Sequence, residues 1–316
     1  MRDHGGNLDA AQARWGGGPW VDLSTGINRV PYPLPDLPGS AWTDLPTRAA
    51  MDLLTRAART AYGTQAAVLP VAGAQAAIQM VPGLAAPGRA AVLSPTYNEH
   101  AAALREAGWQ VDPVTRLADL AGADLAVVVN PNNPDGQTHA PQALRDLAGR
   151  VGQLIVDESF ADPVPHLSIA ADPGPALVLR SFGKFYGLAG LRLGFVIGAP
   201  DRINGLARRA GPWPVSGAAI AIGCAALTDR AWQAATTARL ARDAARLDAL
   251  AAAAGWSLVG GAHLFRLYHT PDAAAAQERL ARGRIWSRIF PWHDHWLRLG
   301  LPGSVAEWAQ LGKALT

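Results

Sequence analysis

The sequence lacks the features that mark extracellular, membrane-spanning or nucleic-acid-binding proteins. It contains one cysteine, Cys224, so no disulfide can form within the chain, and this fits a reducing compartment. The longest apolar stretch, residues 217–227, is too short to cross a bilayer and predicts a buried helix instead. The N-terminus carries no apolar segment of the kind found in secretory signals. We therefore expect a cytoplasmic protein with no membrane partner.

Charged residues are sparse, and no run of lysines and arginines stands out. They make up 17% of the 316 residues, with a net charge of +3 and a pI near 9.3. Nucleic acid is therefore not an expected partner, whereas scattered arginines suit small anionic ligands such as phosphates and carboxylates. A hydrophobic content of 49% is typical of a soluble globular protein with one large or two moderate domains.

Short apolar runs alternate with helical patterns through the middle of the chain. The runs predict strands at residues 90–94, 111–114, 125–130, 154–157, 177–181 and 193–197. Helices are clearest at 98–107 and 141–151. This alternation predicts an α/β fold with a mainly parallel sheet covered by helices. Functional residues then collect at the carboxyl ends of the strands. Five residues fall there: Tyr97, Asn130, Asp157, Ser181 and Lys184.

The composition changes toward both ends of the chain. Residues 1–40 are rich in glycine and proline around a short helix at 8–15, and we expect an N-terminal arm that packs with a small domain and the active site. Residues 41–205 would form the large α/β domain. Residues 206–316 would form a smaller α/β domain, entered by a long helix over 231–254 that lacks glycine and proline.

A glycine-rich segment, Ser-Phe-Gly-Lys-Phe-Tyr-Gly-Leu-Ala-Gly-Leu-Arg-Leu-Gly at 181–194, carries a single lysine, Lys184. A lysine among small and apolar residues is poorly solvated, which lowers its pKa and makes the neutral amine available as a nucleophile. A surface lysine in a turn is the alternative for Lys184 taken alone. The length of the pattern favours the functional interpretation.

This segment resembles the cofactor-binding lysine region of fold-type I pyridoxal-phosphate enzymes, the aspartate aminotransferase superfamily. Asn-Pro-Asn-Asn-Pro-Asp-Gly at 130–136 resembles a loop of the same enzymes. The resemblance implies that the large domain binds pyridoxal 5'-phosphate through Lys184. It also implies that Asn130 hydrogen-bonds the phenolic oxygen of the cofactor and contacts the substrate. No metal is expected.

The resemblance implies further cofactor contacts. Asp157 would pair with the protonated pyridine nitrogen and so keep the ring a strong electron sink, and Tyr97 would stack on the ring face and serve catalysis. The cofactor phosphate would be held by an arginine, a serine and the turn into a helix. These residues are Gly73, Ala74, Gln75, Ser181 and Arg192.

Substrate contacts are implied at both ends of the chain. Arg298 matches the arginine that clamps the substrate carboxylate, and Arg288 would reach a second anionic group. His4-Gly5-Gly6-Asn7 and Ser24-Thr25-Gly26-Ile27-Asn28 resemble the opening of the threonine-phosphate decarboxylase family of cobalamin biosynthesis. That resemblance implies that His4, Gly5 and Asn28 help to bind the substrate phosphate.

Two positions depart from the superfamily pattern. Phe160 stands where many transaminases carry a tyrosine that bonds the phenolic oxygen, and this disfavours a generalist transaminase. Trp42 stands near the place of a tyrosine that reaches the cofactor phosphate across a dimer interface in relatives.

The resemblance therefore implies decarboxylation of L-threonine O-3-phosphate to (R)-1-amino-2-propanol O-2-phosphate by a homodimer. A histidinol-phosphate-type aminotransferase that uses 2-oxoglutarate is the alternative. A non-catalytic ligand- or DNA-binding relative is a third reading. It is disfavoured because Lys184, Asp157 and Asn130 are retained and no winged helix is visible ahead of residue 40.

Overall fold

The structure, a computed structural model, describes residues 4–315 and divides into two compact units. The sheet unit comprises residues 32–133 and 138–232. The terminal unit comprises the described residues of 1–31, 134–137 and 233–316. By their contacts, residues 32–40 of the predicted arm and residues 206–232 of the predicted small domain group with the sheet unit. The domain division at residues 41 and 206 stays a prediction.

A seven-stranded sheet forms the centre of the sheet unit, in the order β2-β8-β7-β6-β5-β3-β4. Its strands are β2 (Ala67–Val71), β3 (Arg89–Leu93), β4 (Gln110–Val114), β5 (Leu125–Val129), β6 (Leu154–Asp157), β7 (Leu177–Ser181) and β8 (Gly194–Gly198). The strands β3 to β7 run parallel, whereas β8 is antiparallel to both β7 and β2. The predicted mainly parallel α/β sheet is thus confirmed. Each edge strand contains a proline, Pro70 in β2 and Pro113 in β4, which suits a position with one unpaired side.

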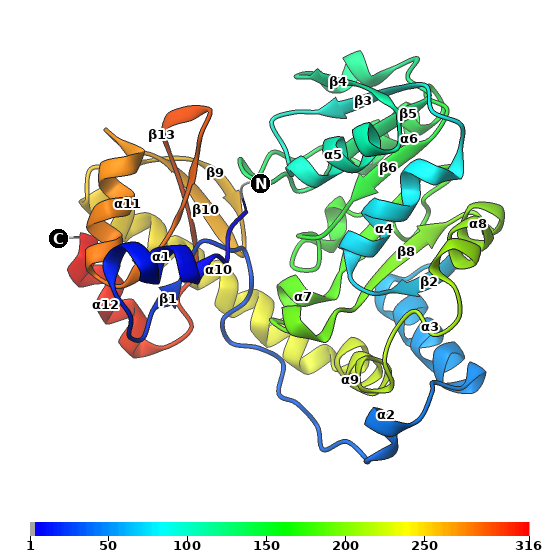
Figure 1. Cartoon of the computed structure of the whole chain (residues 1–316), viewed down its shortest axis with the longest axis horizontal. Coiled ribbons are helices and arrows are strands. Elements are labelled where there is room, and N and C mark those ends of the chain that lie inside the picture. Colours follow the sequence, from blue (N-terminus) through cyan, green and yellow to red (C-terminus); the bar gives the residue numbers. More distant parts are fainter. Residues whose placement is uncertain (1–3, 316) are drawn as a thin grey trace. The chain divides into compact units, whose positions relative to one another are not determined.

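Helices alternate with these strands. They are α2 (Ser40–Thr43), α3 (Arg48–Tyr62), α4 (Ala74–Met80), α5 (Asn98–Glu106), α6 (Pro141–Ala148), α7 (Phe182–Phe185), α8 (Pro200–Ala210) and α9 (Gly217–Thr228). Apolar residues of α4, α5 and α8 pack with β3, β5 and β7 in one buried core, and Figure 1 shows α4 and α5 against the sheet. Burying a Leu or Val side chain of this kind contributes about 1.5–3 kcal/mol.

The helix α10 (Arg230–Ala253) begins in the sheet unit and continues into the terminal unit. There it is followed by a four-stranded sheet in the order β12-β13-β10-β9. The other elements of this unit are α1 (Leu8–Trp15), β1 (Val21–Asp22), β9 (Ser257–Ala262), β10 (Phe265–His269), α11 (Ala273–Arg282), β11 (Ile285–Trp286), β12 (Arg288–Phe290), β13 (His293–Gly300) and α12 (Val305–Leu315). The strand β1 pairs in parallel with β11, so the N-terminal segment joins the C-terminal part of the chain.

The segment 217–227, expected to be a buried helix, lies in α9, where most side chains are buried. The helix predicted at 8–15 is α1. The long helix predicted at 231–254 is α10, which begins one residue earlier and ends one residue earlier. Within the part of the chain that the structure describes, no helix has both the length and the hydropathy needed to cross a membrane.

Candidate functional site

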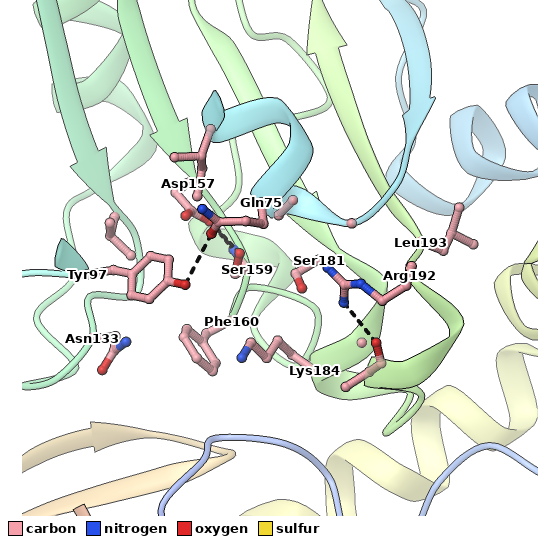
Figure 2. Close-up of a pocket in the computed structure, with 16 residues that line it drawn as sticks. Gln75, Tyr97, Asn133, Asp157, Ser159, Phe160, Ser181, Lys184, Arg192 and Leu193 are labelled. Atoms are coloured by element: carbon pink, nitrogen blue, oxygen red, sulfur yellow. Dashed lines mark hydrogen bonds between the residues drawn. The ribbon is translucent and has the colours of Figure 1, made fainter. Parts of the chain in front are cut away.

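A pocket of about 170 Å³ opens at the carboxyl ends of the parallel strands of the sheet unit. Side chains reach it from the segments that follow β3, β5, β6 and β7, and from the first turn of α4 (Figure 2). These strands end at one edge of the sheet, so residues far apart in the sequence meet there. Among the predicted cofactor-binding residues, eight line this pocket: Gly73, Ala74, Gln75, Tyr97, Asp157, Ser181, Lys184 and Arg192.

Lys184 lies on the short helix α7, which begins directly after β7. Its Nζ lies 5.6 Å from the centroid of the Phe160 ring, which also lines the pocket. A Cβ atom on Gly183 would lie 2.8 Å from the Cα of Ala189, so the close packing of α7 on the next turn requires glycine. The amine is thus held at the pocket by a tightly packed backbone.

An arginine and a hydroxyl stand beside the turn that opens α4. Gly73 has φ 78° and lies so close to Arg192 that a Cβ at position 73 would be 2.6 Å from Nη2. Arg192 donates from Nη1 to the carbonyl of Ala189 at 2.8 Å, and Ser181 lines the same side of the pocket. A guanidinium, a hydroxyl and the free N–H groups of a helix's first turn together suit a phosphate group.

Asp157 ends β6 and is buried at the floor of the pocket. Its Oδ1 accepts hydrogen bonds from the backbone N–H of Ser159 at 3.0 Å and from the hydroxyl of Ser159 at 2.5 Å. Its Oδ2 lies 2.8 Å from Nε2 of His100, on α5. Burial alone would raise the pKa of Asp157, but His100 and Ser159 outweigh it and hold the pKa below its ordinary value. A carboxylate that stays ionised at this depth suits a cationic ring nitrogen.

Tyr97 follows β3 and presents its ring to the pocket. Its hydroxyl donates to Oε1 of Gln75 at 3.2 Å, as Figure 2 shows. Burial, with smaller effects of Glu99 and Asp157, raises the pKa of Tyr97 to about 12. The phenol therefore keeps its proton at neutral pH. The side chain of Gln75 is occupied by this contact, so only its backbone remains for the predicted phosphate contact.

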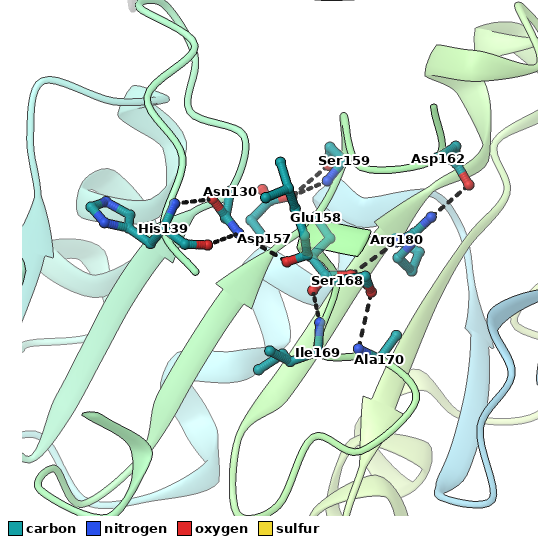
Figure 3. Close-up of polar contacts among 11 residues, drawn as sticks. Asn130, His139, Asp157, Glu158, Ser159, Asp162, Ser168, Ile169, Ala170 and Arg180 are labelled. Atoms are coloured by element: carbon teal, nitrogen blue, oxygen red, sulfur yellow. Dashed lines mark hydrogen bonds and ion pairs between the residues drawn. The ribbon is translucent and has the colours of Figure 1, made fainter. Parts of the chain in front are cut away.

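The structure places the predicted Asn130 outside the pocket. Its amide group donates to the carbonyls of His139 and Leu167, both at 3.2 Å, and its side-chain oxygen accepts from the N–H of His139 at 2.9 Å (Figure 3). These contacts hold the loop that leads away from β5. Asn133, three residues later in the same motif, lines the pocket instead. Asn130 is thus engaged in holding this loop, and Asn133 is the better placed of the two for the predicted cofactor contact.

Sequence reasoning also missed His100 and Ser159. Both contact Asp157, and Ser159 lines the pocket as well. A histidine three residues after the aromatic Tyr97, in the first turn of a helix that follows a strand end, was the available signal.

Apart from Asn130, which belongs to the sheet unit, the predicted substrate residues lie in the terminal unit, where Arg298 and Gly5 lie next to Ser24. Arg298, which is buried on β13, donates to the carbonyl oxygen of Ser24 at 2.6 Å. A Cβ on Gly5 would lie 2.4 Å from the same oxygen, so only glycine fits there. Burial, with a smaller contribution from the charge of Arg288, lowers the pKa of Arg298 to about 9. Two cations beside each other suit an anionic ligand.

The remaining predicted substrate residues differ in exposure. Asn28 is buried, and its side-chain oxygen accepts hydrogen bonds from Arg239 at 2.7 Å and from the N–H of Val30 at 3.1 Å. Arg288 is half-buried beside the ring of Phe290, and His4 is exposed. Arg298 and Gly5 therefore lie together at Ser24, while the side-chain oxygen of Asn28 is engaged by Arg239 and Val30, and the substrate role of Asn28 stays a prediction.

In the sheet unit, a buried ionic cluster lies at the ends of β6 and β7, beside the pocket (Figure 3). Arg180, the residue before Ser181, pairs with Glu158 at 2.9 Å and with Asp162 at 2.6 Å. Glu158, the residue after Asp157, also accepts from the hydroxyl of Ser168 and from the N–H of Ile169. Burial raises the pKa of Glu158 despite these partners. The cluster ties the ends of β6 and β7 to the loop that follows β6.

Comparison with known proteins gives three findings. The family model for aminotransferase class I and II matches residues 43–307. The chain is 44% identical to threonine-phosphate decarboxylases from a Sinorhizobium species, over 99% of this chain and 97% of the relative, and from Pseudomonas aeruginosa, over 100% and 97%. Histidinol-phosphate aminotransferase from Sinorhizobium meliloti, solved in complex with pyridoxal-5'-phosphate, has a TM-score of 0.82 at 19% identity, over 97% of this chain and 92% of that one.

Proposed function

This chain belongs to the aminotransferase class I and II family, and on that premise we propose that it is a pyridoxal-phosphate-dependent threonine-phosphate decarboxylase. The observation that carries the proposal is the 44% identity to two such decarboxylases over essentially the whole chain. A match of this length includes both the pocket and the arginines of the terminal unit. The product, aminopropanol phosphate, would serve cobalamin synthesis, as the resemblance of the N-terminal segments implies.

The residues of the pocket fit the cofactor. Arg192 and Ser181 would hold its phosphate where Gly73 leaves room, Asp157 would face the ring nitrogen, and Tyr97 would cover the ring. When bound, pyridoxal phosphate supplies an electron sink for the bond broken at the substrate Cα. Lys184 would anchor the aldehyde end and, once the substrate amine takes its place, hold a proton near Cα.

The substrate would be held by its two anionic ends. We propose that Arg298 binds the carboxylate and that Arg288 reaches a second anionic group, because the pair forms a cationic site. His4 and Gly5 remain candidates for the phosphate end. Holding both ends fixes which bond at Cα is broken, since a bond perpendicular to the cofactor ring is the one that is weakened. Loss of carbon dioxide and placement of a proton on Cα complete the proposed reaction.

Product analysis with O-phospho-L-threonine tests this proposal. Purified protein loaded with cofactor is incubated with and without 2-oxoglutarate. Carbon dioxide and aminopropanol phosphate in both arms are the expected result. Glutamate formed only with the keto acid, or no reaction alongside turnover of histidinol phosphate, would favour the aminotransferase.

We further propose that the enzyme is a cytoplasmic homodimer. The single cysteine fits a reducing compartment. Large apolar side chains are exposed around α2 and α3: Leu34, Trp42, Leu45 and Leu53. Trp42 is 70% exposed, which is unusual for tryptophan unless a partner covers it. Replacement of Trp42 by arginine is expected to lower the mass measured by light scattering. An unchanged dimer in that variant would show that Trp42 is not needed for association.

A further inference from the structure

A chain of two hydrogen bonds connects a buried carboxylate to the ring of Tyr97. Gln75 donates from Nε2 to Oε2 of Glu99 at 3.1 Å and accepts from the hydroxyl of Tyr97 at 3.2 Å. Glu99 is 6% exposed and lies in the first turn of α5, while Gln75 lies in the first turn of α4. The bonds thus join the starts of α4 and α5, and Figure 2 shows the one between Tyr97 and Gln75.

The order of donors and acceptors in this chain is fixed by Glu99. A carboxylate only accepts hydrogen bonds, so the amino end of the Gln75 amide must face it. The carbonyl end then faces Tyr97, whose phenol donates. An amide turned by 180° would place its oxygen against the carboxylate, and the cost of that repulsion is high where water is excluded. Glu99 therefore determines that the carbonyl oxygen of the Gln75 amide, rather than its amino group, bonds the Tyr97 hydroxyl.

The ring of Tyr97 also contacts His100, which lies on α5 like Glu99. The Tyr97 ring is perpendicular to that of His100, with centroids 6.2 Å apart, and His100 is itself bonded to Asp157. The ring is therefore held at its hydroxyl by Gln75 and along its body by His100. Two such contacts define the tilt of an aromatic ring, whereas one would let it rotate.

We propose that Glu99 and Gln75 are positioning residues, which hold the Tyr97 ring at a fixed angle to the cofactor; this inference rests on the proposed function. Neither residue needs to touch the reacting atoms. The inferred route from Glu99 to the cofactor runs through the Gln75 side chain and the Tyr97 hydroxyl, so the effect of Glu99 should disappear when that hydroxyl is removed.

Cofactor affinity and the visible absorption of the bound cofactor, both measured without substrate, test this inference. Glu99→Met keeps the side-chain size but removes the acceptor. It is expected to raise the dissociation constant of pyridoxal phosphate by about 3- to 10-fold, the effect of one ordinary hydrogen bond, and to shift the absorption band. Glu99→Gln keeps an acceptor for Gln75 and is expected to stay within about twofold of the unchanged chain. Glu106→Met, on the exposed part of the same helix, is the matched control and is expected to change neither readout.

The decisive comparison uses Tyr97→Phe as background. Tyr97→Phe alone is expected to weaken binding as Glu99→Met does, and the double variant is expected to equal Tyr97→Phe. Additive losses, or an unchanged dissociation constant in Glu99→Met, would overturn the positioning role. Should Glu99→Met fail to fold, Gln75→Met tests the same chain of bonds by the same criteria.

The outcome is separable from that of the proposed function. If the unchanged chain binds the cofactor but transaminates, the proposed function fails and the positioning role can still be measured. If it decarboxylates and the double variant shows additive losses, only the positioning role fails. If the unchanged chain binds no pyridoxal phosphate, both are overturned.

Discussion

The ends of β6 and β7 carry two regions of opposite character, although they are built from adjacent residues. Asp157 and Ser181 line the pocket, while their neighbours Glu158 and Arg180 belong to the buried ionic cluster. Successive side chains of a strand point to opposite faces, so one strand end supplies both regions. The pocket presents groups to a ligand, whereas the cluster pairs its charges within the protein. The residues of the pocket and those of the ionic cluster are thus direct neighbours in the sequence.

The two regions also differ in how they hold a carboxylate. Hydrogen bonds from His100 and Ser159 keep the pKa of Asp157 low, whereas burial prevails at Glu158 and raises its pKa. Asp157 is therefore kept charged for a ligand. Glu158, in contrast, is charged only at a cost in folding free energy. Substitutions in the pocket should affect binding and catalysis, and substitutions in the cluster should affect stability.

The largest expected effect is in the pocket. Lys184→Ala removes the amine and is expected to lower product formation by on the order of 1,000-fold or more, with little change in unfolding free energy. The chain has one other lysine, Lys313, so Lys313→Ala is a matched control that should keep full activity. Borohydride reduction followed by peptide mapping is expected to find the cofactor on Lys184 alone. Full turnover by Lys184→Ala, or label on Lys313, would contradict the assignment.

In the cluster, Arg180→Met leaves Glu158 and Asp162 buried without their cation. Such a change is expected to cost about 3–5 kcal/mol of unfolding free energy, measured by urea denaturation. Arg116→Met is the control, because the ion pair of Arg116 with Asp119 is exposed and its loss should not be measurable. Equal losses of unfolding free energy in the two variants would contradict the stabilising role of the ionic cluster.

The two asparagines of the loop after β5 give a finer test. Asn130→Ala leaves backbone groups of His139 and Leu167 without partners and is expected to lower stability by about 1–3 kcal/mol with little effect on cofactor affinity. Asn133→Ala is expected to raise the dissociation constant of pyridoxal phosphate by about 3- to 10-fold with stability nearly unchanged. Each variant is the control for the other, and the reversed pattern would return the cofactor contact to Asn130.

The smallest effects concern pH, and here the two carboxylates should differ in sign. The lowered pKa of Asp157 means that its stabilisation is fully present above the ordinary value of 3.8 and is lost as pH falls through the lower value of the folded state. The raised pKa of Glu158 means that its penalty is absent below 4.5 and grows as pH rises above it. Compared with Asp157→Asn, the unchanged chain should therefore gain stability with pH, and compared with Glu158→Gln it should lose some. Unfolding free energies between pH 3 and 7 measure both trends, and trends of the same sign would contradict the contrast.

The sequence predicted the parts of this molecule that depend on local patterns. The strand at 177–181 and the helix at 8–15 have the predicted bounds, and eight predicted residues meet in one pocket. The hairpin of β12 and β13 was not predicted, because its histidines and tryptophans do not alternate as in an ordinary half-buried strand.

Residues that depend on contacts between distant segments were also missed. His100 contacts Asp157, which lies 57 residues later in the sequence, and no local sequence pattern predicts a contact over that separation. Asn130 and Asn133 share one motif, and the path of the loop decides which of them turns to the pocket. The residue types of the site were thus predictable, whereas the partner of each was not.

The prolines at both edges of the seven-stranded sheet affect whether strands of other chains can add to it. A strand from another chain that adds to a sheet needs a continuous row of N–H donors, and Pro70 in β2 and Pro113 in β4 interrupt that row. Edge-to-edge extension, the first step of many fibrillar aggregates, is thereby discouraged at both ends of the sheet. Orderly self-association through the sheet unit is thereby left to its helices and loops.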